Sequence, residues 1–170
     1  MNQTFNIPSE KISLLPYTLS HPIKQAADAI QAQHYGKAMN HLIDFFEIST
    51  PFCSFVFLRL LQLAAADNAA IQPALRQFVD KIDSKRPLSF GDWLNDLLTP
   101  LIATAAKHIP QASLTESFCN YIYIKRRNIL LGSKTSPSIV QLRNEYRGHS
   151  TTLSEEIYKQ VVEQLIPRTN

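Results

Sequence analysis

The stretch that decides the fold of this chain is residues 52–66, FCSFVFLRLLQLAAA. Its apolar residues fall on nearly every side of a helical wheel and are interrupted by Arg59 and Gln62. A helix that is hydrophobic all round belongs at the centre of a helical bundle. The run is also too short to cross a bilayer, so we expect a buried core helix rather than a membrane segment.

Apolar residues on both sides of this stretch recur three and four positions apart, the spacing of amphipathic helices. Gly36 and Pro51 are expected to end helices, and Pro167 to close the last one. We expect a single all-α domain over residues 1–170, a bundle of about seven to eight helices after an irregular lead-in at 1–19. The helices are expected at residues 23–35, 37–48, 52–66, 68–85, 89–108, 114–131, 138–147 and 155–166.

Composition and charge narrow the class of protein. The chain has 170 residues, of which 45% are hydrophobic and 18% charged, as in an ordinary soluble globular domain. Residues 1–110 carry nine Lys/Arg and nine Asp/Glu, whereas residues 111–170 carry eight and five. A local basic surface can attract a polyanion such as RNA. The first residues lack the pattern of a signal peptide, so we expect a cytoplasmic protein with no membrane partner.

The cysteines, Asp92, Asp96 and most of the histidines do not indicate a catalytic or metal-binding site. Cys53 and Cys119 lie in apolar surroundings without ligand spacing, which indicates buried free thiols, so we expect no metal and no other cofactor. Asp92 and Asp96 are interpreted as helix-capping residues. The histidines other than His149 are interpreted as surface or cap residues: His21, His34, His41 and His108.

The residues best suited to chemistry lie in the stretch 138–150, SIVQLRNEYRGHS. Arg143 and Arg147 are four apart, so a helix places both guanidinium groups on one face. Asn144 stands beside Arg143. His149 follows Gly148, a residue type that often closes helices, so its imidazole is expected near the negative end of a helix dipole.

Arg143-Asn144-x4-His149 resembles the Arg-polar-x4–6-His motif of the HEPN superfamily, and the likeness extends over about residues 138–160. The resemblance implies a HEPN-like helical bundle with the motif at a helix end. Many members of this family are metal-independent endoribonucleases, often in bacterial defence or toxin–antitoxin systems. They pair the motifs of two protomers in one cleft, which implies a homodimer here. The toxin branch often has a tyrosine two residues after the histidine, where this chain has Thr151.

The chemistry that the resemblance implies suits these residue types. RNA cleavage without a metal needs a group that takes the proton of the ribose 2′-hydroxyl, and His149 has the titration range for it. Arg143 can clamp the phosphate because a guanidinium binds two phosphate oxygens at once. Asn144 can orient the phosphate or the imidazole. The expected product is a 2′,3′-cyclic phosphate.

Further cations extend the expected RNA contact. Arg147 would support Arg143 at the phosphate. Lys125, Arg126 and Arg127 follow two tyrosines in a predicted helix, and aromatic and cationic side chains together favour single-stranded RNA. The alternative for the three consecutive cations is a solvated helix end.

Two other readings stay open at this point. In one, the chain is a HEPN-like module that binds RNA, a nucleotide or a protein regulator without cutting, in a sensor role or beside an attached effector domain of a larger protein. In the other, it is an unrelated helical adaptor. Arg143 and Arg147 would then form surface ion pairs with Glu145, Glu155 or Glu156.

Overall fold

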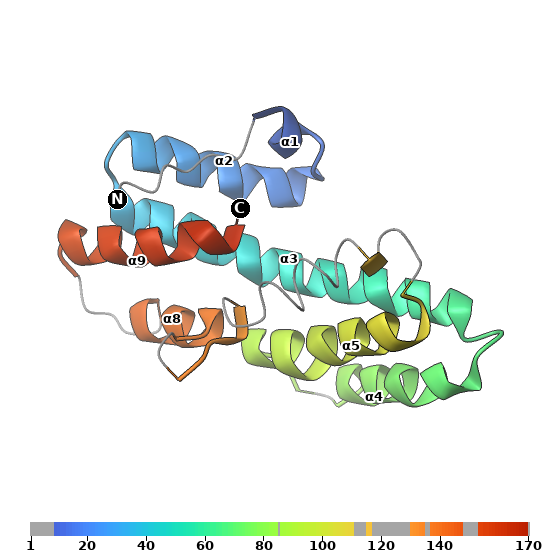
Figure 1. Ribbon diagram of the computed structural model, residues 1–170. Coiled ribbons are helices and arrows are strands. Elements are labelled where there is room, and N and C mark those ends of the chain that lie inside the picture. Colours follow the sequence, from blue (N-terminus) through green and yellow to red (C-terminus); the bar gives the residue numbers. More distant parts are fainter. Residues whose placement is uncertain are drawn as a thin grey trace. The chain divides into compact units, whose positions relative to one another are not determined.

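A computed structural model describes residues 9–84, 86–110, 115–116, 130–134, 137–147 and 153–169. The described residues are helical or form the turns between helices, and they contain no strand, so the predicted all-α fold is confirmed (Figure 1). The chain gathers into two compact units. Unit 1 comprises Met1–Ser49 with Ile129–Asn170, and unit 2 comprises Thr50–Asn128.

Unit 1 brings the two ends of the sequence together. Its helices are α1 (Ser9–Ser13), α2 (Tyr17–Gln31), the first part of α3 (Tyr35–Ala64), α8 (Ile139–Tyr146) and α9 (Glu155–Thr169). Aliphatic side chains from these helices are almost fully buried: Leu19, Ile23, Leu42, Ile43, Ile139, Leu142, Val161 and Leu165. Helical structure therefore reaches into the lead-in that was expected to be irregular, and that expectation was wrong.

The turn between α2 and α3 differs from the prediction. α2 ends at Gln31 because Gln33 adopts a left-handed φ of 58°, and the His34 amide donates to the Ala29 carbonyl at 2.8 Å. Gly36, expected as the stop, lies instead in the first turn of α3. A Cβ at Gly36 would stand 3.3 Å from the ring of Tyr158 on α9, so the glycine allows a close approach of α9.

α3 is one helix of 30 residues where two were expected, with Pro51 inside it. Pro51 lacks the amide that would reach the Glu47 carbonyl, and its ring crowds that carbonyl, at a cost of about 3 kcal/mol. This cost does not outweigh the burial of apolar side chains on both sides of Pro51, such as Ile43 and Phe57. The boundary between the two units falls just before this proline, between Ser49 and Thr50.

The apolar run 52–66 was expected to be too short to cross a bilayer, but the helix that contains it, α3, is longer than expected. Among the described helices it is the one long and apolar enough to cross a bilayer, although the core helix of a soluble protein passes the same test. It is not buried all round either. Phe57 and Leu61 are fully buried, whereas Phe52, Phe55 and Leu63 are 44–59% exposed. Cytoplasmic location stays a prediction.

Unit 2 contains the second part of α3, η1 (Ala69–Ile71), α4 (Gln72–Ile82), η2 (Asp92–Leu98) and α5 (Thr99–His108). Asn68 caps η1 by accepting from the Ala70 amide at 3.1 Å. η2 is a π-helix that runs directly into α5, and Pro100 lies in the first turn of α5, where a proline is tolerated. Phe55 packs against Phe78 and Trp93, with ring centroids 5.7 Å apart in both pairs.

Three further expectations concern the end of the last helix, the cysteines and the predicted helix 114–131. The last helix does not stop at Pro167, because α9 continues to Thr169 with the proline in its final turns. Cys53 is a free thiol, as expected, but it is only partly buried, and burial raises its pKa to about 11. Most of the predicted helix 114–131, including Cys119, lies outside the described residues.

Candidate functional site

The sequence fixes α8 firmly at its first turn. The Ser138 side chain accepts from the Gln141 amide at 3.1 Å, and the Gln141 side chain accepts from the Ser138 amide at 2.7 Å. This reciprocal capping satisfies two amides that a helix start leaves unpaired. Ile139 and Leu142 are each 1% exposed and anchor the helix in unit 1. The capped and anchored helix presents its arginines on a different face.

Arg143 and Arg147 meet on one carboxylate. Nε of Arg143 donates to Oε1 of Glu47 at 2.8 Å, and Nη1 of Arg147 donates to Oε2 of the same group at 2.8 Å. Nη1 of Arg147 is also 2.8 Å from Oδ1 of Asp44. Nη1 of Arg143 donates to Oδ1 of Asn144 at 3.2 Å. The spacing of four thus places both guanidinium groups together, and α8 runs antiparallel to α3 along this contact.

The carboxylates come from α3, which sequence reasoning missed. Glu145, Glu155 and Glu156 were named as possible partners, but Glu155 instead accepts from the Tyr35 amide at 2.9 Å. Asp44 and Glu47 are three apart on a helix rich in apolar residues, and this spacing was the available signal. Their pairing with α8 joins residues about a hundred positions apart, and no local pattern predicts such a contact.

A histidine extends the same row on α3. Nδ1 of His41 lies 4.0 Å from Oδ2 of Asp44. We call these residues the α3–α8 cluster: His41, Asp44, Glu47, Arg143, Asn144 and Arg147. His41 was interpreted from the sequence as an isolated surface or cap residue, and its place beside Asp44 is a feature that the sequence alone did not indicate.

The charges of the cluster are balanced and reachable from solvent. Two guanidinium groups face two carboxylates, and their side chains are 26–37% exposed. Ion pairs at such exposure stabilise a fold by only about 0.2–1 kcal/mol each. Each guanidinium carries five N–H donors. The hydrogen bonds described above use Nε and Nη1 of Arg143 and Nη1 of Arg147. Donors therefore remain within the described part of the cluster for a second anion.

The other predicted site residues lie in parts of the chain that the structure does not describe. His149, which follows Arg147 by two residues in the sequence, is outside the described residues. So are Lys125, Arg126 and Arg127. Their roles stay predictions.

Unit 2 has a polar cluster of its own around Asp92, which is 9% exposed. Its carboxylate accepts from the Ser89 hydroxyl at 2.7 Å, from the Ser89 amide at 2.8 Å and from both terminal nitrogens of Arg86 at 2.7 and 3.2 Å. Nζ of Lys81 stands 3.0 Å away. Hydrogen bonds from Ser89, then from Arg86, hold the pKa of the Asp92 carboxyl well below its usual range. Asp92 therefore supports the start of η2 by accepting from the Ser89 amide. Asp96 lies inside η2 and pairs with Lys81, so its interpretation as a capping residue was wrong.

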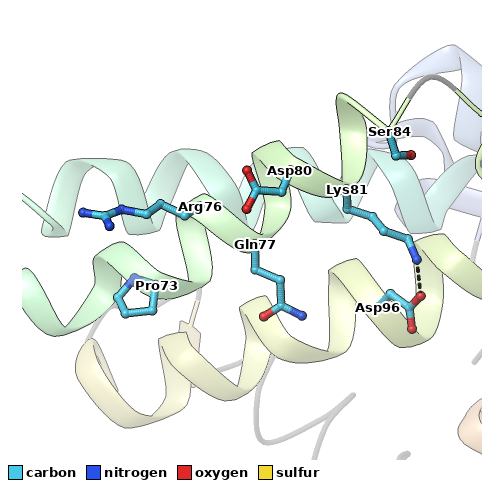
Figure 2. A pocket seen from close by; sticks show the side chains of 7 residues that line it. All are labelled: Pro73, Arg76, Gln77, Asp80, Lys81, Ser84 and Asp96. Atoms are coloured by element: carbon cyan, nitrogen blue, oxygen red, sulfur yellow. Dashed lines mark hydrogen bonds and ion pairs between the residues drawn. The ribbon is translucent and has the colours of Figure 1, made fainter.

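Beside this cluster lies an open pocket of about 590 Å³. Figure 2 shows Lys81 reaching Asp96, and Gln77 pointing from α4 toward the helix that carries Asp96. The hydrogen bond to Asp96, followed by that to Asp92, raises the pKa of the Lys81 ammonium. The pocket carries two cations and two carboxylates, so its lining favours neither an anion nor a cation. It is lined by Pro73, Arg76, Gln77, Asp80, Lys81, Ser84 and Asp96.

No family model, curated protein or solved structure matches this chain. The described residues also contain no group of three or more His, Cys, Asp or Glu side chains placed to hold a metal ion. The features of this chain that point to a function are therefore the α3–α8 cluster and the motif that includes His149.

Proposed function

We propose that this chain is a HEPN-like, metal-independent endoribonuclease whose site is built on the α3–α8 cluster. The observation that carries the proposal is the convergence of Arg143 and Arg147 on Glu47, at 2.8 Å each. Guanidinium groups held in place need little reorganisation when negative charge builds on a phosphate. They stand at the end of α8, immediately before the motif histidine in the sequence.

Each residue has a role in the proposed reaction. The remaining N–H donors of Arg143 and Arg147 bind the nonbridging oxygens of the scissile phosphate. Asn144, already bonded to Arg143, orients that guanidinium. His149 takes the proton of the ribose 2′-hydroxyl, and the oxygen attacks the phosphorus to form a 2′,3′-cyclic phosphate. Lys125, Arg126 and Arg127 extend the contact along the RNA backbone.

The reaction needs a second proton-transfer group, which protonates the departing 5′-oxygen. A partner protomer in a homodimer would supply it through its own motif, and a further side chain of the same chain is the other source. The cellular setting that accompanies the proposal is bacterial defence or toxin–antitoxin function in the cytoplasm.

A non-catalytic function is the second candidate, and the charge balance of the cluster favours it. Asp44 and Glu47 neutralise both arginines, and their negative charge opposes the approach of a phosphate. In this case the chain is a helical module that binds RNA, a nucleotide or a protein partner without cutting.

The two functions separate in one assay. Purified wild-type protein is incubated with end-labelled single-stranded RNA in EDTA, beside His149→Ala and the control His34→Ala on the exposed turn before α3. The endoribonuclease predicts cleavage by wild type and control, and a loss of about 10²-fold or more in His149→Ala. RNA retention in a filter-binding assay without cleavage by any protein would support the binding module and contradict the enzyme.

Glu47 gives a second test of how the cluster works. Glu47→Gln keeps the side-chain shape but removes the charge that holds both guanidinium groups. We expect kcat to fall about ten-fold, because a small misplacement of catalytic groups is costly. KM should not rise, because the site also loses a charge that repels RNA.

Steady-state cleavage kinetics measure both constants, with the exposed Glu163→Gln on α9 as the matched control. An unchanged kcat in Glu47→Gln would show that Glu47 does not position the arginines for catalysis.

A further inference from the structure

A row of apolar side chains on the second part of α3 faces solvent. Phe52, Phe55 and Leu63 are 44%, 52% and 59% exposed. Helical residues at these spacings lie on one side of a helix, and Arg59 lies between them on the same side. Phe57, on the opposite side, is fully buried. We call the exposed row the α3 stripe: Phe52, Phe55, Arg59 and Leu63.

The stripe contains one ring that is held in place and one charge that is not paired. The ring of Phe55 packs against Phe78 and Trp93, with ring centroids 5.7 Å apart in both pairs, although half of its surface is exposed. A side chain that is already fixed loses little conformational freedom when a partner covers it. Arg59 is exposed and forms no ion pair with another described residue. A partner is therefore expected to cover the ring and to accept the guanidinium.

The size of the stripe indicates the kind of interface that it can form. Single exposed apolar residues are ordinary on a protein surface, but here three large ones lie in one row. About half of their surface is exposed, which leaves about 300 Å² of apolar area, as large as the patches that mark interaction sites. Each protein in a standard complex covers about 800 Å². The stripe can therefore supply the apolar centre of an interface with a polar rim.

The position of Arg59 favours a second copy of this chain as the occupant. Insertion of the stripe into lipid would carry an unpaired charge into hydrocarbon. A second copy brings phenyl rings, whose faces attract a guanidinium. If two copies of α3 pair antiparallel, each Arg59 lies against phenyl rings of the other copy, whereas a parallel pair would place the two Arg59 side chains face to face. The stripe is thus self-complementary, as a two-fold interface requires.

We propose that the α3 stripe is a homodimer interface, in which α3 of two copies pairs antiparallel and each Arg59 lies over phenyl rings of the other copy. The modest apolar area gives a reversible dimer, with a dissociation constant on the order of 1–100 µM. This inference goes beyond the proposed ribonuclease function and does not rest on it, because it concerns self-association in the absence of RNA.

The orientation of the two helices is tested with Arg59→Glu. This variant places a carboxylate against the negative faces of the phenyl rings, so it should associate more weakly than wild type, both with itself and in a mixture with wild type. In a parallel pair, the mixture would instead bring the new carboxylate against Arg59 of the wild-type copy. Sedimentation of a fluorescently labelled variant with excess wild type measures the mixed dimer. A mixed dimer tighter than the wild-type dimer would overturn the antiparallel arrangement.

The interface itself is tested by sedimentation velocity without RNA, on wild type, Phe52→Asp and Leu63→Asp. The control is Leu14→Asp, which changes an apolar side chain that is 84% exposed in unit 1. Melting temperature checks the folding of each variant.

Wild type should dimerise reversibly, and both stripe variants should raise the dissociation constant by about 10²-fold or more, because each buries an unpaired charge in the interface. Leu14→Asp should match wild type. Stripe variants that dimerise as tightly as wild type would overturn the proposal. So would wild type that stays monomeric at about 200 µM, above the expected dissociation constant. If that monomer sediments with phosphatidylcholine vesicles, the stripe belongs to a lipid surface instead.

Discussion

Replacing Arg143 by alanine is expected to lower kcat/KM for RNA by about 10²–10³-fold, the loss typical of one donor that stabilises charge in a transition state. Arg143 bonds Glu47 through Nε and Asn144 through Nη1, so its plane is fixed and its other donors point elsewhere. Glu47 and Arg147 would remain paired in the variant, so the fold should survive. The loss should therefore be catalytic rather than structural.

The comparison is sharpened by two further variants. Arg143→Lys retains a positive charge but not the planar fork, and we expect it to recover only part of the activity. Arg76→Ala removes an exposed arginine from α4 in unit 2 and should leave cleavage unchanged. Quantitative gel assays in EDTA measure all three rates. Wild-type cleavage by Arg143→Ala would remove this guanidinium from the mechanism.

The second large effect concerns the stability of unit 2. Asp92→Asn is expected to lower the free energy of unfolding by about 2–3 kcal/mol, because it leaves the cations around a largely buried carboxylate without their counter-charge. Ser89, Arg86 and Lys81 all contact this group. Asp80→Asn, an exposed change on α4, should stay within about 0.5 kcal/mol of wild type.

The pH dependence of this effect has a defined sign. Folding lowers the pKa of Asp92 from its ordinary 3.8, so the ionised carboxylate stabilises the fold fully above that value. The stabilisation is lost as the pH falls below it toward the lower folded pKa. Urea denaturation of wild type and Asp92→Asn should therefore give a constant difference above about pH 5 and a shrinking one under more acidic conditions. A difference that does not change with pH would contradict the ionic role of Asp92.

Much of the fold follows from the sequence because helical periodicity is local. The apolar spacing in α2, α4 and α5 predicted helices that the structure contains. Errors occur in the lead-in, where α1 was not expected, and at Gly36, Pro51 and Pro167. A proline removes one hydrogen bond and a glycine weakens a helix slightly, and burial of the surrounding apolar side chains outweighs either effect. Whether that burial exists depends on packing partners far away in sequence.

The part of the candidate site that depends on local spacing could also be predicted from the sequence. Arg143, Asn144 and Arg147 could be found because their spacing on α8 is a local property. Glu47, Asp44 and His41 could not, because their relevance comes from the packing of α8 against α3. Polar residues on an apolar helix were the visible signal, but the sequence does not tell which helix faces them.

We propose that the α3–α8 cluster supports RNA cleavage by attack of the 2′-hydroxyl. The most direct measurement is the chemical identity of the new ends after wild-type protein cuts RNA in EDTA, read by mass spectrometry. The proposed site predicts a 2′,3′-cyclic phosphate and a 5′-hydroxyl, formed by wild type and not by His149→Ala. Products with 3′-hydroxyl and 5′-phosphate ends, or intact RNA, would contradict it.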